Sequence, residues 1–334
     1  DLHWWSNSEE VMKTAGQSYM SMPSLESLLK GLISTATVDF NDGKIEMNQK
    51  MYGSDALMGI FKKYSGKTVS SDMIKNIPSK NVAAIVALNY QPEGIKELIK
   101  VLGFDGIVNM GLTQAGITID DFVKANKGDL LFSVSDFTVK QDSAVQQGMK
   151  LSADAHYLFA VSIGDKASFN KLMDVGKKFG GEIDQEGVHN AINDKYLAIG
   201  NNQQFVSGFI QGNNNTFDFT SKFDGHPICI FVDIQKILST MPRNISGDSS
   251  VAKIVAESKN FWGNLYSFGG EFKDDGVVAN TEINLIDKTK NSLKQLNQYA
   301  DIIYVEVKKK QAMDDDKSLK EDMREDMIDS TKAQ

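Results

Sequence analysis

Two segments of this 334-residue chain carry the pattern of a tight β-hairpin that runs into a helix, residues 37–64 and 265–299. In the first segment, alternating apolar and polar residues flank Asn41-Asp42-Gly43. In the second, the same alternation flanks Lys273-Asp274-Asp275-Gly276. Tight hairpin turns need positive φ angles, which Gly adopts freely and which Asp and Asn tolerate. The sequence therefore predicts two hairpins, with Asp42-Gly43 and Asp275-Gly276 at equivalent turns.

A helix start follows each predicted hairpin. Ser54 or Asp55 is expected to cap the first helix and Asp287 the second, because their side-chain oxygens accept hydrogen bonds from the free N–H groups of a first turn. Apolar residues then recur at helical spacing in both segments: Leu57, Phe61 and Tyr64 in the first, and Leu293, Leu296 and Ala300 in the second.

The two hairpins close two longer stretches of similar plan, residues 1–65 and 226–300. In each stretch the pattern predicts a strand, two helices, the hairpin and a final helix. We interpret the stretches as two copies of one β-α-α-β-β-α unit. The elements expected before the hairpins are strands at 1–6 and 228–234 and helices at 8–15, 25–33, 235–239 and 251–261.

The middle of the chain repeats the order of strand and then helix. The pattern predicts strands at 81–90, 129–139, 157–163, 188–192 and 195–200, and helices at 92–102, 119–126, 166–179 and 203–210. These strands are one-sided or mixed in polarity, as is typical of antiparallel sheets. The expected fold class is α+β, with largely antiparallel sheets, helices on one face and the internal duplication.

Polar stretches divide the chain. Linkers are predicted at 140–155 and 212–225. The first separates two expected α/β halves, 1–140 and 156–310, unless adjacent sheets continue through it. Residues 311–334 form a charged C-terminal tail in which Leu319, Met323 and Met327 recur at helical spacing. That tail fits either a solvated helix end or a helix that docks on a partner.

Composition narrows the class of protein. A hydrophobic content of 41% and a charged content of 24% are typical of globular proteins, and the net charge of −8 argues against nucleic acid as a partner. No window is apolar for long enough to form a transmembrane helix. The single cysteine, Cys229, lies in an apolar run and predicts a buried thiol. The chain begins at Asp1 rather than Met, so we expect a processed N-terminus.

Motifs for catalysis are incomplete. Residues 65–68 resemble the end of a phosphate-binding loop, but Phe61 occupies the place of its first glycine. Residues 16–20 lack the second glycine of a nucleophile elbow, and the SxxK pairs at 27–30 and 168–171 have no companion motifs. We therefore predict no catalytic residues and no cofactor.

Metal-binding patterns are also incomplete. The histidines are His3, His156, His189 and His226, and their spacing matches no metal motif. The acidic run 314–316 lacks the glycine and the distal glutamate of a calcium-binding loop. No metal site is predicted.

The neighbouring aromatic residues Trp4 and Trp5 are the candidate binding residues. Neighbours on a strand face opposite sides, so we expect one of them in the core and the other exposed, where it can stack on a sugar or on a partner surface. The alternative is that both indoles pack against other parts of the chain. Trp262, which follows Phe261, is expected in the core.

One segment carries a family resemblance. Residues 119–137 read as a helix, then Lys127-Gly128-Asp129, an apolar strand, and Ser135-Asp136-Phe137. Together with the strand–helix openings and the late hairpin, this segment resembles uncharacterised lipoproteins of Bacteroidota that carry a domain of unknown function. The resemblance implies export and tethering through a lipidated N-terminal cysteine, an anchor absent from this chain. It implies no catalytic residues.

The leading hypothesis is a non-enzymatic exported envelope protein, outer membrane-associated, periplasmic or on the cell surface. It would serve as a binding or scaffold subunit with envelope proteins as partners, and without nucleic acid. A first alternative is a carbohydrate or peptide binder that uses Trp4 or Trp5. A second is an enzyme whose site assembles from scattered residues such as Asp154, His156 and His189.

Overall fold

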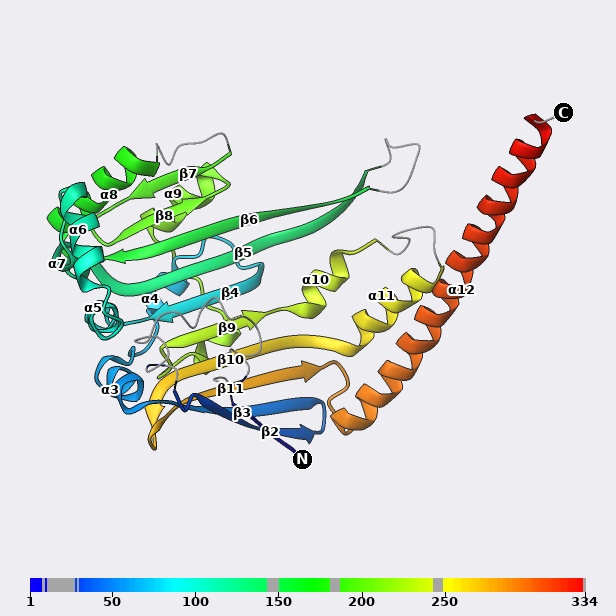
Figure 1. Ribbon diagram of the computed structural model, residues 1–334, viewed down its shortest axis with the longest axis horizontal. Coiled ribbons are helices and arrows are strands. Elements are labelled where there is room, and N and C mark those ends of the chain that lie inside the picture. Colours follow the sequence, from blue (N-terminus) through cyan, green and yellow to red (C-terminus); the bar gives the residue numbers. More distant parts are fainter. Residues whose placement is uncertain are drawn as a thin grey trace.

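The strands of this protein form one sheet. The computed structural model describes residues 1–7, 10, 28, 30–142, 150–180, 187–242 and 249–332, and within them the sheet has eleven strands. Each pair of neighbouring strands is antiparallel. The prediction of a mixed helix and strand fold with antiparallel pairing is therefore confirmed (Figure 1).

The order of strands in the sheet differs from their order in the chain. It is β1-β2-β3-β11-β10-β9-β4-β5-β6-β8-β7, so strands from the end of the chain lie between β3 and β4. The strands are β1 (Leu2–Asn7), β2 (Ile33–Asn41), β3 (Lys44–Tyr52), β4 (Val82–Asn89), β5 (Asn126–Asp142), β6 (Lys150–Ile163), β7 (His189–Ile192), β8 (Tyr196–Gly200), β9 (Ile228–Val232), β10 (Trp262–Lys273) and β11 (Gly276–Leu285).

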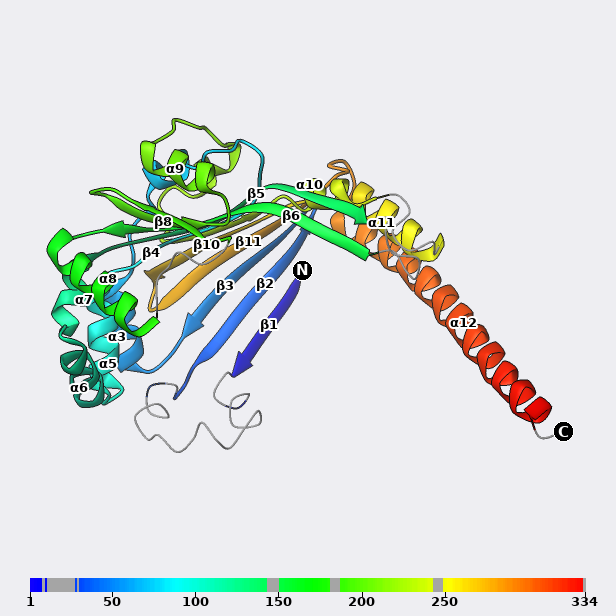
Figure 2. The ribbon, with the colours of Figure 1, turned by 90° about the horizontal axis from the view of Figure 1, so that it is seen from above.

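Most of the described helices gather at the two ends of the strands rather than on one face. Figure 1 shows α3, α5, α6, α7 and α8 at one end and α10, α11 and α12 at the other. Figure 2 shows α9 above one side of the sheet, and α12 extending well beyond it. The helices are α3 (Asp55–Tyr64), α4 (Ser71–Lys75), α5 (Pro92–Val101), α6 (Asp105–Ala115), α7 (Ile119–Ala125), α8 (Lys166–Gly180), α9 (Gln203–Gln211), the 3-10 helix η2 (Asp218–Lys222), α10 (Ile234–Thr240), α11 (Ser249–Phe261) and α12 (Ser292–Lys332).

The main hydrophobic core lies on one face of strands β9, β4, β5, β6 and β8. Cys229, Ala87, Leu131, Ala160 and Ala198 lie opposite one another across these strands, and all are buried. Directly opposed residues of antiparallel strands share a face, so this row marks the core face. Helices α4, α9 and η2 cover it with Met73, Ile74, Phe205, Phe209 and Phe219.

Both predicted hairpins are present. Asp42-Gly43 joins β2 to β3, and Gly43 has a φ of 63°. The second turn is Asp274-Asp275, with φ angles of 49° and 64°, and Gly276 already belongs to β11. The second turn therefore lies one residue earlier in the chain than predicted. Asp274 and Asp275 adopt the left-handed conformation that the prediction assigned to Asp275 and Gly276.

Of the two predicted helix caps, the one at Ser54 is confirmed and the one at Asp287 is not. Ser54 caps α3 by accepting a hydrogen bond from the Leu57 N–H, as predicted. The predicted cap Asp287 is wrong, because α12 begins at Ser292. Asp287 instead accepts bonds from the N–H and hydroxyl of Thr289, and so closes a local turn before the helix.

Further differences concern segments with weak patterns. Ile33 begins β2 instead of ending a helix, and the predicted linker at 140–155 overlaps the distal ends of the long strands β5 and β6. The predicted linker at 212–225 contains η2, and α6 was not predicted. Apart from residue 10, the predicted helix 8–15 lies outside the described residues, as do residues 25–27 and 29 of the predicted helix 25–33. Both expected halves of the chain contribute strands to the one sheet.

Candidate functional site

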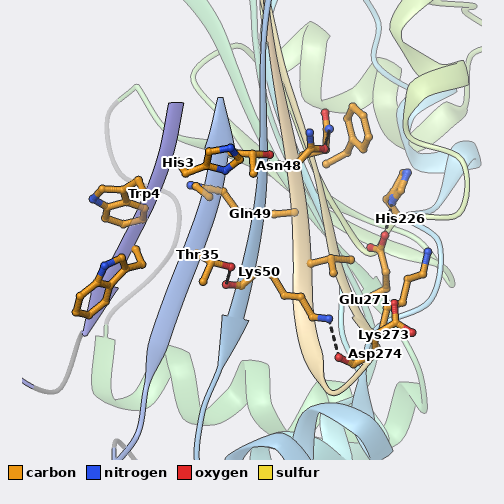
Figure 3. Close-up of a pocket in the computed structure, with 17 residues that line it drawn as sticks. His3, Trp4, Thr35, Asn48, Gln49, Lys50, His226, Glu271, Lys273 and Asp274 are labelled. Atoms are coloured by element: carbon orange, nitrogen blue, oxygen red, sulfur yellow. Dashed lines mark hydrogen bonds and ion pairs between the residues drawn. The ribbon is translucent and has the colours of Figure 1, made fainter. Parts of the chain in front are cut away.

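A groove crosses one face of β1, β2, β3, β11 and β10. Its volume is about 680 Å³. We call it the Trp5 groove and define it by Trp5, Thr37, Asn48, Phe268, Glu271 and Asn280. Figure 3 shows His3 from β1 at one side and His226 and Glu271 at the other. Four of the five strands that form it belong to the predicted hairpins and the fifth is the N-terminal strand.

The register of the sheet explains why these side chains meet. His3 lies opposite Thr37, Thr37 opposite Asn48, Asn48 opposite Asn280, and Asn280 opposite Phe268. The same row continues from Phe268 to Cys229, which belongs to the covered core face. The groove is therefore the continuation of the core face past the edge of the layer formed by α4, α9 and η2.

The outer wall of the groove comes from the edge strand β1. Trp5 is 69% exposed and Trp4 is 48% exposed, so the expectation that one of them is in the core is wrong. Trp5 pairs with Thr35 and faces the groove side. Trp4 pairs with Ala36 and also lines the groove (Figure 3). Among the described strands β1 is an outer edge, which leaves both indoles with one open side.

The inner wall holds a histidine–carboxylate pair. The Nδ1 of His226 lies 3.0 Å from Oε1 of Glu271, and the His226 ring lies 4.7 Å from the Phe268 ring (Figure 3). The other carboxylate oxygen, Glu271 Oε2, is buried and has no hydrogen-bond partner among the described residues. Sequence reasoning missed this pair, because the two residues are 45 positions apart and no local pattern links them.

The floor of the groove is a pair of amides. Asn280 Nδ2 donates to Asn48 Oδ1 across the β3–β11 pairing at 2.6 Å. Asn280 Oδ1 is buried and accepts no hydrogen bond from the described part of the chain. Lys50 Nζ, nearby in the groove, donates to the backbone oxygen of Asp274 at 2.6 Å. The groove thus presents acceptors and exposed aromatic surface together.

A second polar cluster surrounds His156. Its Nδ1 lies 3.1 Å from Asp136 Oδ2, and the Ser79 hydroxyl donates to the other oxygen of Asp136. Asn202 uses Oδ1 to cap α9, so its Nδ2 is the group directed at His156 Nε2. The serine contacts the carboxylate and not the imidazole, so the cluster lacks the order of a nucleophile–base–acid triad. It joins β5, β6 and α9.

Of the scattered residues suggested as an enzyme site, Asp154 and His156 lie two residues apart on β6, and His189 lies on another strand. Asp154 pairs with Lys140 rather than with His156, and this hydrogen bond lowers the pKa of Asp154. His189 lies on β7, two strands away from β6. Strands are about 4.8 Å apart, so His189 starts about 10 Å from His156.

The remaining motif residues have structural contacts. Ser168 binds the capping residue Asp165, and Lys171 pairs with Asp121. Cys229 is buried, as predicted. Trp262 is half-buried against Phe261 and packs edge-on to Tyr299. Residues 16–20, Ser27 and Leu29 lie outside the described residues, as do the side chains of 314–316 and of the tail residues Leu319, Met323 and Met327.

Two searches of the described residues gave negative results. Histidine, cysteine, aspartate and glutamate side chains form no group of three able to hold a metal ion there. None of the helices described is both long enough and apolar enough to cross a membrane.

Comparison of the chain with family models, curated proteins and solved structures finds no match.

Proposed function

We propose that this protein is a non-enzymatic binding protein and that the Trp5 groove holds its ligand. The observation that carries the proposal is the exposed indole of Trp5 in the same groove as two residues, Glu271 and Asn280, whose buried acceptor atoms have no partner in the described part of the chain. A large exposed aromatic side chain costs hydration free energy until a ligand covers it, and aromatic residues dominate binding contacts for that reason.

The proposal is tested by the fluorescence of Trp5. In a Trp4→Phe/Trp262→Phe variant, Trp5 is the only indole, and acrylamide quenching reports its exposure. We expect soluble probes drawn from neutral oligosaccharides, acidic oligosaccharides and decapeptides to include a class that protects Trp5. Trp5→Ala should then weaken binding at least tenfold, while Tyr304→Ala, which removes an exposed aromatic side chain of α12 outside the groove, leaves it unchanged. If no class protects Trp5, the proposed function is wrong.

A second candidate function is that of a scaffold subunit in an envelope complex. On the face opposite the main core, Val86, Phe132 and Phe159 lie directly opposite one another on β4, β5 and β6 and are 39–41% exposed. Tyr157 stacks on Phe132 and is equally exposed. This patch has no charged member, which favours a partner protein with an apolar surface of its own.

Crosslinking mass spectrometry in the native envelope tests the scaffold function. We expect a partner whose crosslinks disappear when Phe132 and Phe159 are replaced by serine, while ligand binding in the groove persists. Finding only the monomer in the native envelope would overturn it. Export, outer-membrane association and an N-terminal lipid anchor, as the Bacteroidota resemblance implies, stay predictions.

We also propose that the chain contains an internal duplication centred on the groove. Asp42 and Asp274 occupy equivalent turn positions 232 residues apart, and the opposed residues Asn48 and Asn280 are separated by the same number. A two-fold axis at the Asn48–Asn280 pair would relate β1-β2-β3 to β9-β10-β11. An experimental structure in which the two hairpins fail to superpose would contradict the duplication.

A further inference from the structure

The inference starts from two acceptors that lack donors. Glu271 and Asn280 both line the Trp5 groove, and Glu271 Oε2 and Asn280 Oδ1 are buried without a hydrogen-bond partner among the described residues. A buried polar atom left unpaired costs about 1–3 kcal/mol, so native proteins rarely keep one without reason. Both atoms can therefore accept hydrogen bonds from a ligand that donates them.

The charge of the groove indicates a neutral donor. Glu271 and Asp274 are acidic, Lys50 and Lys273 are basic, and all four line the groove. Glu271 is engaged on one oxygen by His226, and Lys50 by the backbone of Asp274. With charges of both signs present in equal number, a cationic or an anionic ligand would gain little from the overall field. Neutral hydroxyl groups satisfy the acceptors without placing a new charge.

The surface of the groove combines stacking and planar polar groups. Trp5 on β1 and Phe268 on β10 provide aromatic surface at its two sides. Asn48, Asn280 and Glu271 lie between or beside them as planar polar groups. From β1 to β10 the groove crosses five neighbouring strands, which at about 4.8 Å spacing makes it about 19 Å wide. Sugar rings have apolar C–H faces for stacking and hydroxyl rims for planar polar groups, and this width suits several linked rings.

We propose that the Trp5 groove binds a neutral oligosaccharide, with one ring stacked on Trp5 and hydroxyls donating to Glu271 Oε2 and Asn280 Oδ1. This inference rests on the proposed function, because it names the ligand class of the same site. The His226–Glu271 pair acts as a positioning element, since the bond to Nδ1 fixes the carboxylate that receives the sugar hydroxyl.

The test is a glycan array with the full chain, followed by isothermal titration calorimetry on the hits. Neutral oligosaccharides, acidic oligosaccharides, oligolysine and neutral decapeptides are the probe classes. We expect binding only to neutral oligosaccharides, and weakening of at least tenfold by both Asn280→Ala and Glu271→Gln. His226→Gln should weaken binding less, since it alters only the orientation of Glu271. Tyr304→Ala, at an exposed aromatic residue outside the groove, is the matched control, and circular dichroism confirms that each variant is folded.

The outcomes separate the ligand class from the binding function. Binding of oligolysine or decapeptides, sensitive to Trp5→Ala, would overturn the saccharide inference while the binding function stands. Binding of a neutral oligosaccharide that is indifferent to Asn280→Ala and Glu271→Gln would also overturn it, since the sugar would then lie elsewhere. Absence of binding by every class would remove both the inference and the proposed function.

Discussion

Asp121 connects two helices at one end of the sheet. Its carboxylate accepts a bond from the ammonium of Lys171 on α8 at 3.0 Å. It also accepts bonds from the hydroxyl and N–H of Thr118, which completes the capping box at the start of α7. These hydrogen bonds lower the pKa of Asp121 from 3.8 to about 2, and the one from Lys171 has the largest effect. The folded protein thus holds this carboxylate in its charged form.

A pH dependence follows from this pKa. A carboxyl group whose pKa is lower in the folded state stabilises the fold at every pH above its unfolded pKa, near 4. That contribution is lost as pH falls from about 4 through 2. We predict that Asp121→Asn lowers the midpoint temperature of unfolding at pH 7 and that the difference from the parent chain shrinks toward pH 2. Thermal unfolding scans at a series of pH values from 7 to 2 measure this difference in midpoint temperature.

The matched control is Asp301→Asn on the exposed side of α12. Because Asp301 is exposed, this change should leave the midpoint temperature of unfolding at pH 7 close to that of the parent chain. A constant difference between Asp121→Asn and the parent across the whole range would mean that the Asp121 side chain stabilises by packing and not by charge.

Among the elements, the start of α12 depends on one amide. Asn291 Oδ1 accepts bonds from the N–H groups of Leu293 and Lys294, while its Nδ2 donates to the backbone oxygen of Phe40 on β2 at 2.6 Å. The residue therefore caps the helix and fastens it to the sheet. Loss of a capping side chain costs about 1 kcal/mol, and loss of a further hydrogen bond costs a similar amount.

We predict that Asn291→Ala lowers the free energy of unfolding by about 2 kcal/mol in urea titrations. Asn291→Asp is the matched variant, because it keeps the capping oxygen and removes the donor to Phe40. It should lose about 1 kcal/mol. Equal losses in the two variants would assign the whole effect to the contact with β2.

Elements with a local chemical signal were predictable, and those without it were not. The hairpins, the Ser54 cap and the strand–helix order were read from turn residues and periodicity. Helix α6 was missed because Gly106 and Gly111 interrupt it and no residue of it is buried, so it carries little apolar pattern. The groove could not be predicted from the sequence, because its residues Trp5, Asn48, Asn280 and Glu271 come together only through the register of strands that are distant in the chain. Of the residues that line the groove, the sequence identified Trp4 and Trp5 as binding candidates.

For the whole molecule, Cys229 reports on the integrity of the sheet. It lies on β9, between β10 and β4, and is fully buried. Burial raises the pKa of its thiol to about 12, and the nearby carboxylate of Glu271 adds to the shift. At pH 8 about one thiol in 10⁴ would be ionised even if reagent reached it.

We predict that the native protein resists alkylation by iodoacetamide at pH 8 and reacts fully in denaturant. Under native conditions the slow residual labelling should match the rate of global unfolding, measured independently by fluorescence. Rapid labelling of the folded protein would show that the layer of α4, α9 and η2 opens locally above β9.

The strand order also sets the sequence of events during synthesis. Strand β3 receives its partner β11 only when residues near 285 have been made, and β4 likewise waits for β9. Until then the growing chain exposes two unpaired strand edges, which are the surfaces that nascent chains use in aggregation. Closing loops of this length slows folding, since contacts distant in sequence must form before the sheet is continuous. A cell that makes this protein therefore has to shield β3 and β4 until most of the chain has left the ribosome.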